Sequence, residues 1–121
     1  YNTALGKAVL AYQDKERLIE ILKALEKDSK AFPYIGKGGE RLIKMLENVK
    51  KDGFATDDEE FSKGIKAIAV PLFSSDGVNY GINVVGSSDT ISIDELKAAY
   101  APSLIKIGIE ISTMLGYEAI S

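Results

Sequence analysis

The chain has 121 residues, with 15 Lys and Arg against 18 Asp and Glu, and it contains no His, Cys or Trp. Without Cys and His it can form no disulfide framework, no thiolate zinc site and no Ser-His-Asp or Cys-His catalytic arrangement. The net charge of −3 argues against a nucleic-acid binder. The lack of an apolar run of about 18 residues argues against a membrane protein. We therefore expect one soluble cytoplasmic domain.

Helical patterns dominate the first half of the chain. Apolar residues recur at helical spacing in three segments, which predicts helices over residues 3–12, 15–27 and 40–51. Thr3 and Asp14 are suited to cap the first two helices, because their side-chain oxygens can accept a hydrogen bond from a free backbone N–H of the first turn. Gly53 fits a left-handed cap after the third helix, and the glycine-rich stretch at residues 32–39 predicts a loop.

The period changes to that of strands in the second half. Residues 53–56 can hold a short extended piece, and two longer strands are predicted over residues 65–73 and 78–86. Between the longer strands, Ser74-Ser75-Asp76-Gly77 is a hairpin turn signal, so the predicted pair is antiparallel. Pro71 cannot donate a ladder hydrogen bond, and it therefore indicates a sheet edge or a bulge.

A long apolar helix follows the hairpin. Ser92 and Glu95 form the S-x-x-E pattern of a capping box, and the helix runs towards Leu115 with Gly116 placed to cap it. Pro102 falls inside this helix and should kink or restart it. The apolar residues cover most of the helix circumference, which indicates burial on more than one side. The order of helices, hairpin and helix predicts an α+β fold with helices packed on an antiparallel sheet.

Four consecutive carboxylates at Asp57-Asp58-Glu59-Glu60 form the densest cluster of charge in the chain. Such a cluster can bind a hard cation or supply an acid–base pair. It lacks the D-x-D-x-D-G spacing of a calcium loop, and carboxylates are also common in a solvated turn before a helix, where they suit the positive end of the helix dipole. We favour this structural interpretation for the cluster as a whole.

Two further features are candidates for ligand contact. The start of the first helix, Thr3-Ala4-Leu5-Gly6, presents free backbone N–H groups and small side chains, so an anion could approach it closely. The alternative is that the small residues only permit close packing. Asn83 lies in the middle of a predicted strand, where a buried amide would need hydrogen-bond partners from the protein or from a ligand. The residues alone leave both interpretations open.

Five segments form an ordered set of motifs over nearly the whole chain. They are residues 3–11 (TALGKAVLA), 53–60 (GFATDDEE), 64–71 (GIKAIAVP), 84–86 (VVG) and 111–116 (ISTMLG). In this order and at this spacing, the motifs resemble the C-terminal effector-binding domain of IclR-family transcription regulators.

The resemblance implies a GAF-like antiparallel sheet covered by helices. It also implies that residues 1–121 are part of one effector-binding domain, without the family's leading strands and without its N-terminal winged helix-turn-helix domain. We therefore expect an incomplete sheet, with one edge exposed or covered by another chain. The start of the sequence at Tyr1 instead of Met agrees with a piece of a longer protein.

The resemblance further implies an effector pocket between the sheet and the loops. Family members bind small organic acids there, such as short oxo-acids or aromatic acids, and backbone N–H groups at the helix start hold the carboxylate. The ligand-binding residues predicted for this chain are Ala4, Leu5, Gly6, Asp57, Ile65, Ala67, Asn83 and Val85. Leu5 replaces a residue that is often very small in the family, and Val85 replaces one that can carry a hydroxyl. The pocket is therefore expected to be more apolar and to admit a larger or aromatic acid.

We interpret the chain as a ligand-sensing, oligomerising domain with no catalytic residue, no metal site and no cofactor. The expected partners are a small organic acid, further copies in a homodimer or homotetramer, and DNA through the missing N-terminal domain only; no membrane partner is expected. Two alternatives remain. One is a small metabolic enzyme that uses Asp57 or Glu60 as a base, and the other is a GAF-like sensor module attached to a different output domain.

Overall fold

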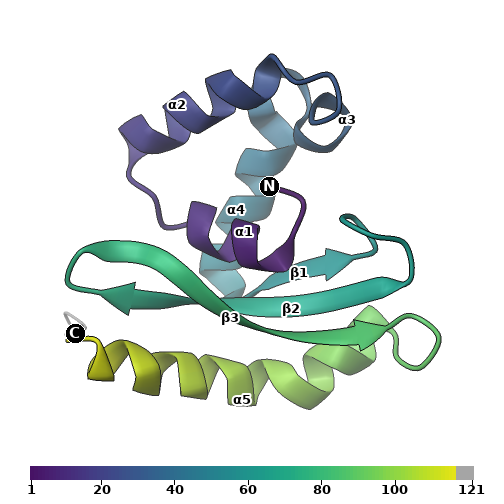
Figure 1. Cartoon of the computed structure of the whole chain (residues 1–121), viewed down its shortest axis with the longest axis vertical. Coiled ribbons are helices and arrows are strands. Elements are labelled where there is room, and N and C mark those ends of the chain that lie inside the picture. Colours follow the sequence, from purple (N-terminus) through teal and green to yellow (C-terminus); the bar gives the residue numbers. More distant parts are fainter. Residues whose placement is uncertain (117–121) are drawn as a thin grey trace.

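In the computed structural model, which describes residues 1–116 and only the backbone at Phe32 and Asn79, one antiparallel sheet separates two helical layers. Helices α1 to α4 lie on one side of the sheet and the long helix α5 lies on the other (Figure 1). The strand order is β1-β2-β3, so β2 is central and β1 and β3 are the two edges. The predicted α+β fold is confirmed. The last five residues of the predicted domain, 117–121, lie outside the described residues.

The three longer helices before the sheet form where the sequence predicts them. They are α1 (Ala4–Leu10), α2 (Lys15–Glu26) and α4 (Glu40–Asp52). The Thr3 side chain accepts a hydrogen bond from the Gly6 N–H at 3.0 Å, and the Asp14 side chain accepts one from the Arg17 N–H at 2.8 Å. Gly53 ends α4 with a φ of 84°, as a left-handed cap requires.

The loop predicted over residues 32–39 is wrong. Two short helical pieces occupy this stretch, α3 (Phe32–Ile35) and η1 (Lys37–Gly39). Pro33 is compatible with a first helical turn, because the N–H that it lacks has no intrahelical partner there. Ile35 is fully buried, so core packing orders the segment. Gly36, with a positive φ, separates its two pieces, and Gly39, also with a positive φ, ends η1 before α4.

The sheet consists of β1 (Ala55–Asp58), β2 (Ile65–Ser74) and β3 (Gly77–Ser87). β1 takes in Asp57 and Asp58, the first two residues of the acidic cluster. The pairing of β1 with β2 ends at Ala69, so Pro71 lies where β2 is locally an edge, and a bulge follows after Leu72. The proline therefore costs the sheet no ladder hydrogen bond on the β1 side.

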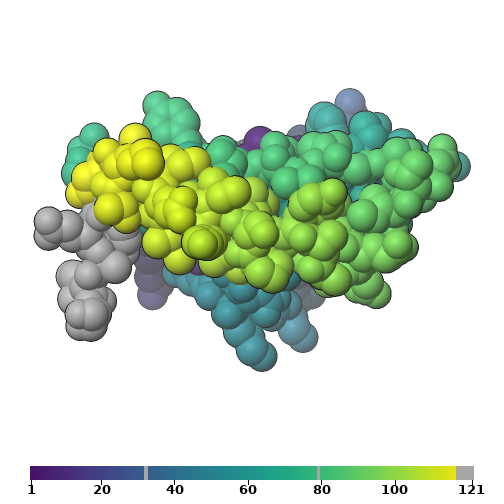
Figure 2. Space-filling model, turned by 90° about the horizontal axis from the view of Figure 1, so that it is seen from below, coloured from purple at the N-terminus to yellow at the C-terminus, as the bar shows by residue number. Residues whose placement is uncertain are grey.

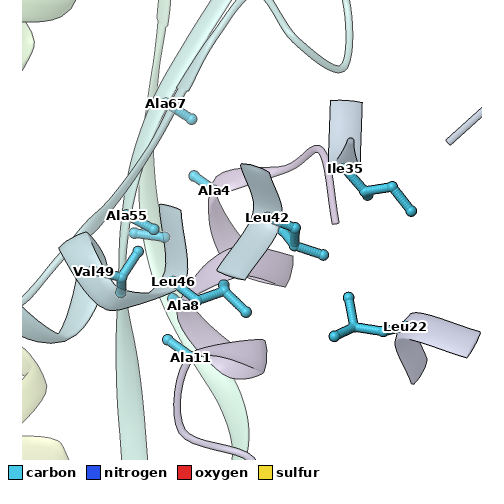
Figure 3. Packing of buried hydrophobic residues seen from close by; sticks show 11 residues of the cluster. Ala4, Ala8, Ala11, Leu22, Ile35, Leu42, Leu46, Val49, Ala55 and Ala67 are labelled. Atoms are coloured by element: carbon cyan, nitrogen blue, oxygen red, sulfur yellow. The ribbon is translucent and has the colours of Figure 1, made fainter. Parts of the chain in front are cut away.

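Alternate residues of β2 point to the two helical layers. Ala67 and Ala69 belong to a buried cluster with the alanines of α1 and with apolar residues of α4 (Figure 3). Ile68 and Val70 belong to a second cluster, which contains Leu104 of α5. We call the side of the sheet that carries Ala67 and Ala69 the α1 face, and the opposite side the α5 face.

The last helix, α5 (Ile93–Met114), begins with the predicted capping box. The Glu95 N–H donates to the Ser92 side chain at 3.1 Å, and the Ser92 N–H donates to the Glu95 carboxylate at 3.2 Å. Of the kink or restart expected at Pro102, a restart does not occur, because the helix continues through this residue. Pro102 is exposed, and water can reach the carbonyl that loses its partner there. Gly116 follows the helix with a φ of 87°. Among the helices of residues 1–116, none has the length and apolarity that a membrane crossing requires.

Candidate functional site

The first turn of α1 retains two free backbone donors. The Gly6 N–H donates to the Thr3 side chain, and the Lys7 N–H donates to the Thr3 carbonyl at 3.0 Å. The N–H groups of Ala4 and Leu5 have no hydrogen-bond partner within residues 1–116. Because such groups carry partial positive charge, Ala4 and Leu5 can hold a carboxylate, whereas the N–H of Gly6 is already engaged. Gly6 still has a steric role, since a Cβ at this position would lie 2.8 Å from Thr3 Oγ1.

Residues from all three strands meet on the α1 face of the sheet. Asp57 of β1 pairs with Ala67 of β2, and Ala67 pairs with Val85 of β3, so these residues form one row across the sheet. Ile65 and Asn83 lie two residues along from Ala67 and Val85, and strand side chains alternate, so both belong to the same face. The five predicted strand residues therefore form one contiguous group, which we call the α1-face patch.

The α1-face patch is covered near β1 and open near β3. Ala4 and Ala67 belong to the same buried cluster and lie close together in Figure 3, whereas Val85 is 57% exposed. Asn83 is also exposed, which differs from the buried amide considered for it. The reason is that β3 is an edge strand and that α1 packs further along it, against Gly81. The Asn83 amide can therefore meet a ligand without losing a buried protein partner.

Asp57 has both a structural contact and a free acceptor. Its side chain is buried, with only 4% of the residue exposed. Oδ1 accepts hydrogen bonds from the N–H groups of Glu60 at 2.8 Å and of Phe61 at 3.3 Å, so Asp57 fixes the turn that follows β1. Oδ2 has no protein partner within the described residues, and it remains able to accept a hydrogen bond from a ligand.

The other carboxylates of the acidic cluster also have partners of their own. Asp58 Oδ1 lies 3.4 Å from Lys66 Nζ, and the Glu59 carboxylate accepts a hydrogen bond from the Gly64 N–H at 2.7 Å. This hydrogen bond is the main cause that lowers the pKa of the exposed Glu59 below its ordinary value. Glu60 forms an ion pair with α1. Across residues 1–116, no group of three acidic, His or Cys side chains is placed to hold a metal ion. The solvated turn before a helix that we favoured for the cluster is wrong, because Asp57 and Asp58 belong to β1, Asp57 is buried, and the next element is the strand β2.

Lys7 is not among the residues predicted to form the site, yet it contacts the residues on either side of the Asp57 turn. Its Nζ donates to Glu60 Oε1 at 2.6 Å, to Glu60 Oε2 at 2.7 Å and to the Thr56 carbonyl at 2.8 Å. The side chain is only 3% exposed. A signal for this burial exists in the sequence, because Lys7 follows Ala4 by three residues and precedes Ala11 by four, which places it on the alanine side of α1. A lysine on a buried helix side needs a charged or polar partner.

Two hollows of the described chain lie away from the α1-face patch. The hollows, of about 420 Å³ and 230 Å³, follow α4 and share Met45, Asn48 and Glu60 in their walls. Neither hollow is lined by a residue of the patch. Near β3 the patch is an open surface, and a ligand there would stay exposed unless a further segment or chain covers it.

The sequence matches one known protein family over most of its length. A family model described as the C-terminal part of the bacterial transcriptional regulator IclR matches residues 1–113. The chain is 34% identical to the HTH-type transcriptional regulator KdgR of Dickeya chrysanthemi, with 98% of this chain and 38% of KdgR covered. It spans less than half the length of the curated relatives that it matches.

The fold matches solved structures of the same kind. The IclR protein of Thermotoga maritima superposes with a TM-score of 0.80 at 32% identity, over 97% of this chain and 47% of that chain. The C-terminal domain of the Escherichia coli transcriptional regulator KdgR superposes with a TM-score of 0.75 at 30% identity, over 97% of this chain and 71% of that chain. Sequence and fold comparisons thus agree on the kind of protein this chain resembles.

Proposed function

Because this chain belongs to the IclR family of bacterial transcriptional regulators and matches its C-terminal part, we propose that it is the effector-binding and oligomerisation domain of such a regulator and that it senses a small organic acid in the cytoplasm. The observation that carries this proposal is the meeting of two features on one face of the sheet. Ala4, which has a free N–H, belongs to the same buried cluster as Ala67, the central residue of the row formed by Asp57, Ala67 and Val85.

The alternative of a metabolic enzyme is wrong, because the matching family and relatives are transcriptional regulators. The contacts of the two proposed bases agree with this correction. Asp57 fixes a turn through two backbone N–H groups, and Glu60 is held by Lys7. Both carboxylates therefore have structural partners already.

The polar groups of the site complement an organic acid. A carboxylate placed at the start of α1 would accept hydrogen bonds from the Ala4 and Leu5 N–H groups, where the helix dipole favours negative charge. Asp57 Oδ2 can accept a hydrogen bond from a hydroxyl of the same ligand, and the exposed Asn83 amide can donate or accept one. This arrangement favours a ligand with a carboxylate at one end and a hydroxyl or carbonyl group at the other.

The apolar members of the site favour a ligand with an apolar body. Leu5, Ile65 and Val85 are the larger apolar residues of the predicted site, and Ile65 and Val85 are exposed in the isolated chain. A solved structure of this fold, the inducer-binding domain of the PobR transcription factor from Acinetobacter, is a complex with 3-hydroxybenzoic acid, and it is 24% identical to this chain. An aromatic hydroxy acid is therefore a rational probe beside a short oxo-acid.

Regulation would follow from differential affinity. An effector that binds one quaternary arrangement more tightly than another shifts the population towards it. The DNA-binding domain, which we place N-terminal to this chain as a winged helix-turn-helix, would be repositioned by that shift. The sequence upstream of residue 1 tests this point, because a different output domain there would favour the GAF-like sensor module instead.

The exposed side of α5 supports a homodimer or homotetramer. Tyr100, Ile107 and Met114 follow each other at seven-residue spacing, which places them on one side of the helix, and Met114 is 82% exposed. Viewed from below, α5 forms a continuous outer surface of the molecule with no further layer over it (Figure 2). We expect Ile107→Lys to reduce the oligomer mass of the full-length protein in light scattering after size exclusion, while Thr113→Lys, on the polar side of α5, leaves it unchanged.

Isothermal titration calorimetry of the full-length protein with pyruvate and 3-hydroxybenzoate tests ligand sensing. Asn83→Ala is the most informative variant, because an exposed side chain is removed with a stability change of about 0.5 kcal/mol or less. We expect it to weaken binding about tenfold, the loss of one good hydrogen bond to a charged or polar ligand. Asn48→Ala, an exposed amide on α4, is the matched control and should bind as the wild type does.

Two results would contradict the proposal. Absence of binding for both acids would reject the chosen ligand class. Unchanged affinity in Asn83→Ala, together with tight binding by the wild type, would place the effector elsewhere on the molecule.

A further inference from the structure

The pair formed by Lys7 and Glu60 joins a buried ammonium group to a partly buried carboxylate. Both Glu60 oxygens lie within 2.7 Å of the Lys7 ammonium, and the side chains are 3% and 26% exposed. Lys7 also donates to the Thr56 carbonyl of β1, so its ammonium group has three protein acceptors. Charge-assisted hydrogen bonds of this length are among the stronger polar contacts in proteins, so the pair holds α1 and β1 at a fixed separation.

The pair connects the two halves of the proposed effector site. Lys7 lies one helical turn after Ala4, whose N–H is one of the two free donors. Glu60 donates its own backbone N–H to Asp57 Oδ1 at 2.8 Å. A displacement of Glu60 therefore changes the orientation of the Asp57 carboxylate, and a displacement of Lys7 moves the start of α1. No other side-chain ion pair within residues 1–116 joins α1 to the segment around Asp57.

We propose that Lys7 and Glu60 are positioning residues for effector binding: their ion pair sets the distance and orientation between the α1 donors and the Asp57 acceptor. This inference rests on the proposed function, because it assigns a role within the same site. Neither residue touches the ligand in this arrangement. Lys7 acts through α1 and Glu60 acts through Asp57, so the specificity of the site for ligand length depends on a pair that is not itself part of the predicted ligand contacts.

Stability alone does not distinguish a positioning role from a purely structural one. Removing one partner leaves a buried charge uncompensated and destabilises the protein, whereas replacing both partners with uncharged side chains of similar size is often close to neutral. The double variant Lys7→Met/Glu60→Gln is therefore the informative one. It is expected to restore the stability lost in Lys7→Met alone, while the connection between α1 and the Asp57 turn stays broken.

Two measurements on the full-length protein test the inference. The first is the affinity for 3-hydroxybenzoate or pyruvate, whichever the wild type binds, which we expect to fall about tenfold or more in the double variant despite its restored thermal stability. The second is hydrogen–deuterium exchange of peptides covering residues 57–61, which we expect to become about tenfold faster because the Glu60 N–H loses its fixed acceptor. Lys66→Met/Asp58→Asn removes a neighbouring, more exposed ion pair and is the matched control, for which neither quantity should change.

The outcomes separate this inference from the proposed function. Wild-type affinity and wild-type exchange in the double variant would overturn the positioning role and leave the proposed function intact. If the wild type binds neither acid, the chosen ligand class is rejected, and wild-type exchange of residues 57–61 in the double variant would still overturn the positioning role. Faster exchange with unchanged affinity would also overturn the inference, since the order of the turn would then not matter for the ligand.

Discussion

The two faces of the sheet are built from different side chains, although they share the same three strands. On the α5 face, Ile68 and Val70 interdigitate with Leu104, and α5 comes so close that a Cβ on Gly108 would lie 2.8 Å from Val70. On the α1 face, Ala67 and Ala69 meet the alanines of α1, and buried polar groups occur beside them. The α5 face is a packed core, and the α1 face combines close backbone approach with polar chemistry.

This difference indicates where stability and ligand binding reside. Large branched side chains contribute most of the free energy of burial, about 1.5–3 kcal/mol for each fully buried one. Alanines contribute less, but they let backbone N–H groups and carboxylates come near a ligand. Substitutions on the α5 face should therefore change the free energy of unfolding, and substitutions on the α1 face should change affinity.

The largest stability effect is expected for Ile68→Ala on the α5 face. Ile68 is fully buried, and truncation removes its transfer free energy and leaves a cavity, at a cost of about 2–5 kcal/mol. Urea denaturation measures this loss. Under conditions where the variant remains folded, its affinity for the effector should equal that of the wild type, and a large loss of affinity would show that the two faces are not independent.

The substitution Ala67→Leu, at the neighbouring position on the α1 face, should affect effector affinity more than the free energy of unfolding. Ala67 lies in the middle of the row between Asp57 and Val85, so a leucine would fill the space next to both. Overpacking should cost about 1–3 kcal/mol, less than Ile68→Ala, and calorimetry should detect no effector binding. Unimpaired binding by a folded Ala67→Leu protein would contradict the location of the site.

Local signals explain what the sequence could predict. Short sequence patterns predict the caps at Thr3, Asp14 and Ser92. Strand alternation predicts that Asp57 and Val85 share the α1 face, once the family resemblance supplies the register of the strands. The pairing of Lys7 with Glu60 joins residues 53 positions apart, and it depends on how α1 docks on β1, which no local pattern specifies. The exposure of Asn83 likewise depends on β3 being an edge of the sheet, a property of topology and not of the strand itself.

The N-caps of α1 and α5, Thr3 and Ser92, allow the two faces to be compared, because both side chains form the same kind of hydrogen bond. Thr3→Ala and Ser92→Ala each remove a side chain that accepts from the third helical N–H, and each should cost about 0.5–2 kcal/mol in urea denaturation. Only Thr3→Ala should also weaken effector binding, because only α1 presents its first turn to the ligand. Thr3→Ser, which keeps the hydroxyl, should restore both quantities, and equal affinities in the two alanine variants would remove α1 from the site.

The smallest effect on stability is expected for Glu59→Gln, in the connection between β1 and β2. The Gly64 N–H lowers the pKa of this carboxyl below its ordinary value of 4.5, so the folded protein favours the ionised form more than the unfolded chain does. The resulting stabilisation is present above the ordinary pKa and is lost as the pH falls through the lowered pKa of the folded state. Thermal denaturation of Glu59→Gln should therefore show a slightly lower midpoint than the wild type at pH 7, and the two midpoints should converge as the pH falls below the lowered pKa of Glu59. The loss of stability should stay below that of the other variants because Glu59 is exposed and solvent screens its charge. A difference between the two midpoints that grows towards acid pH would contradict the lowered pKa of Glu59.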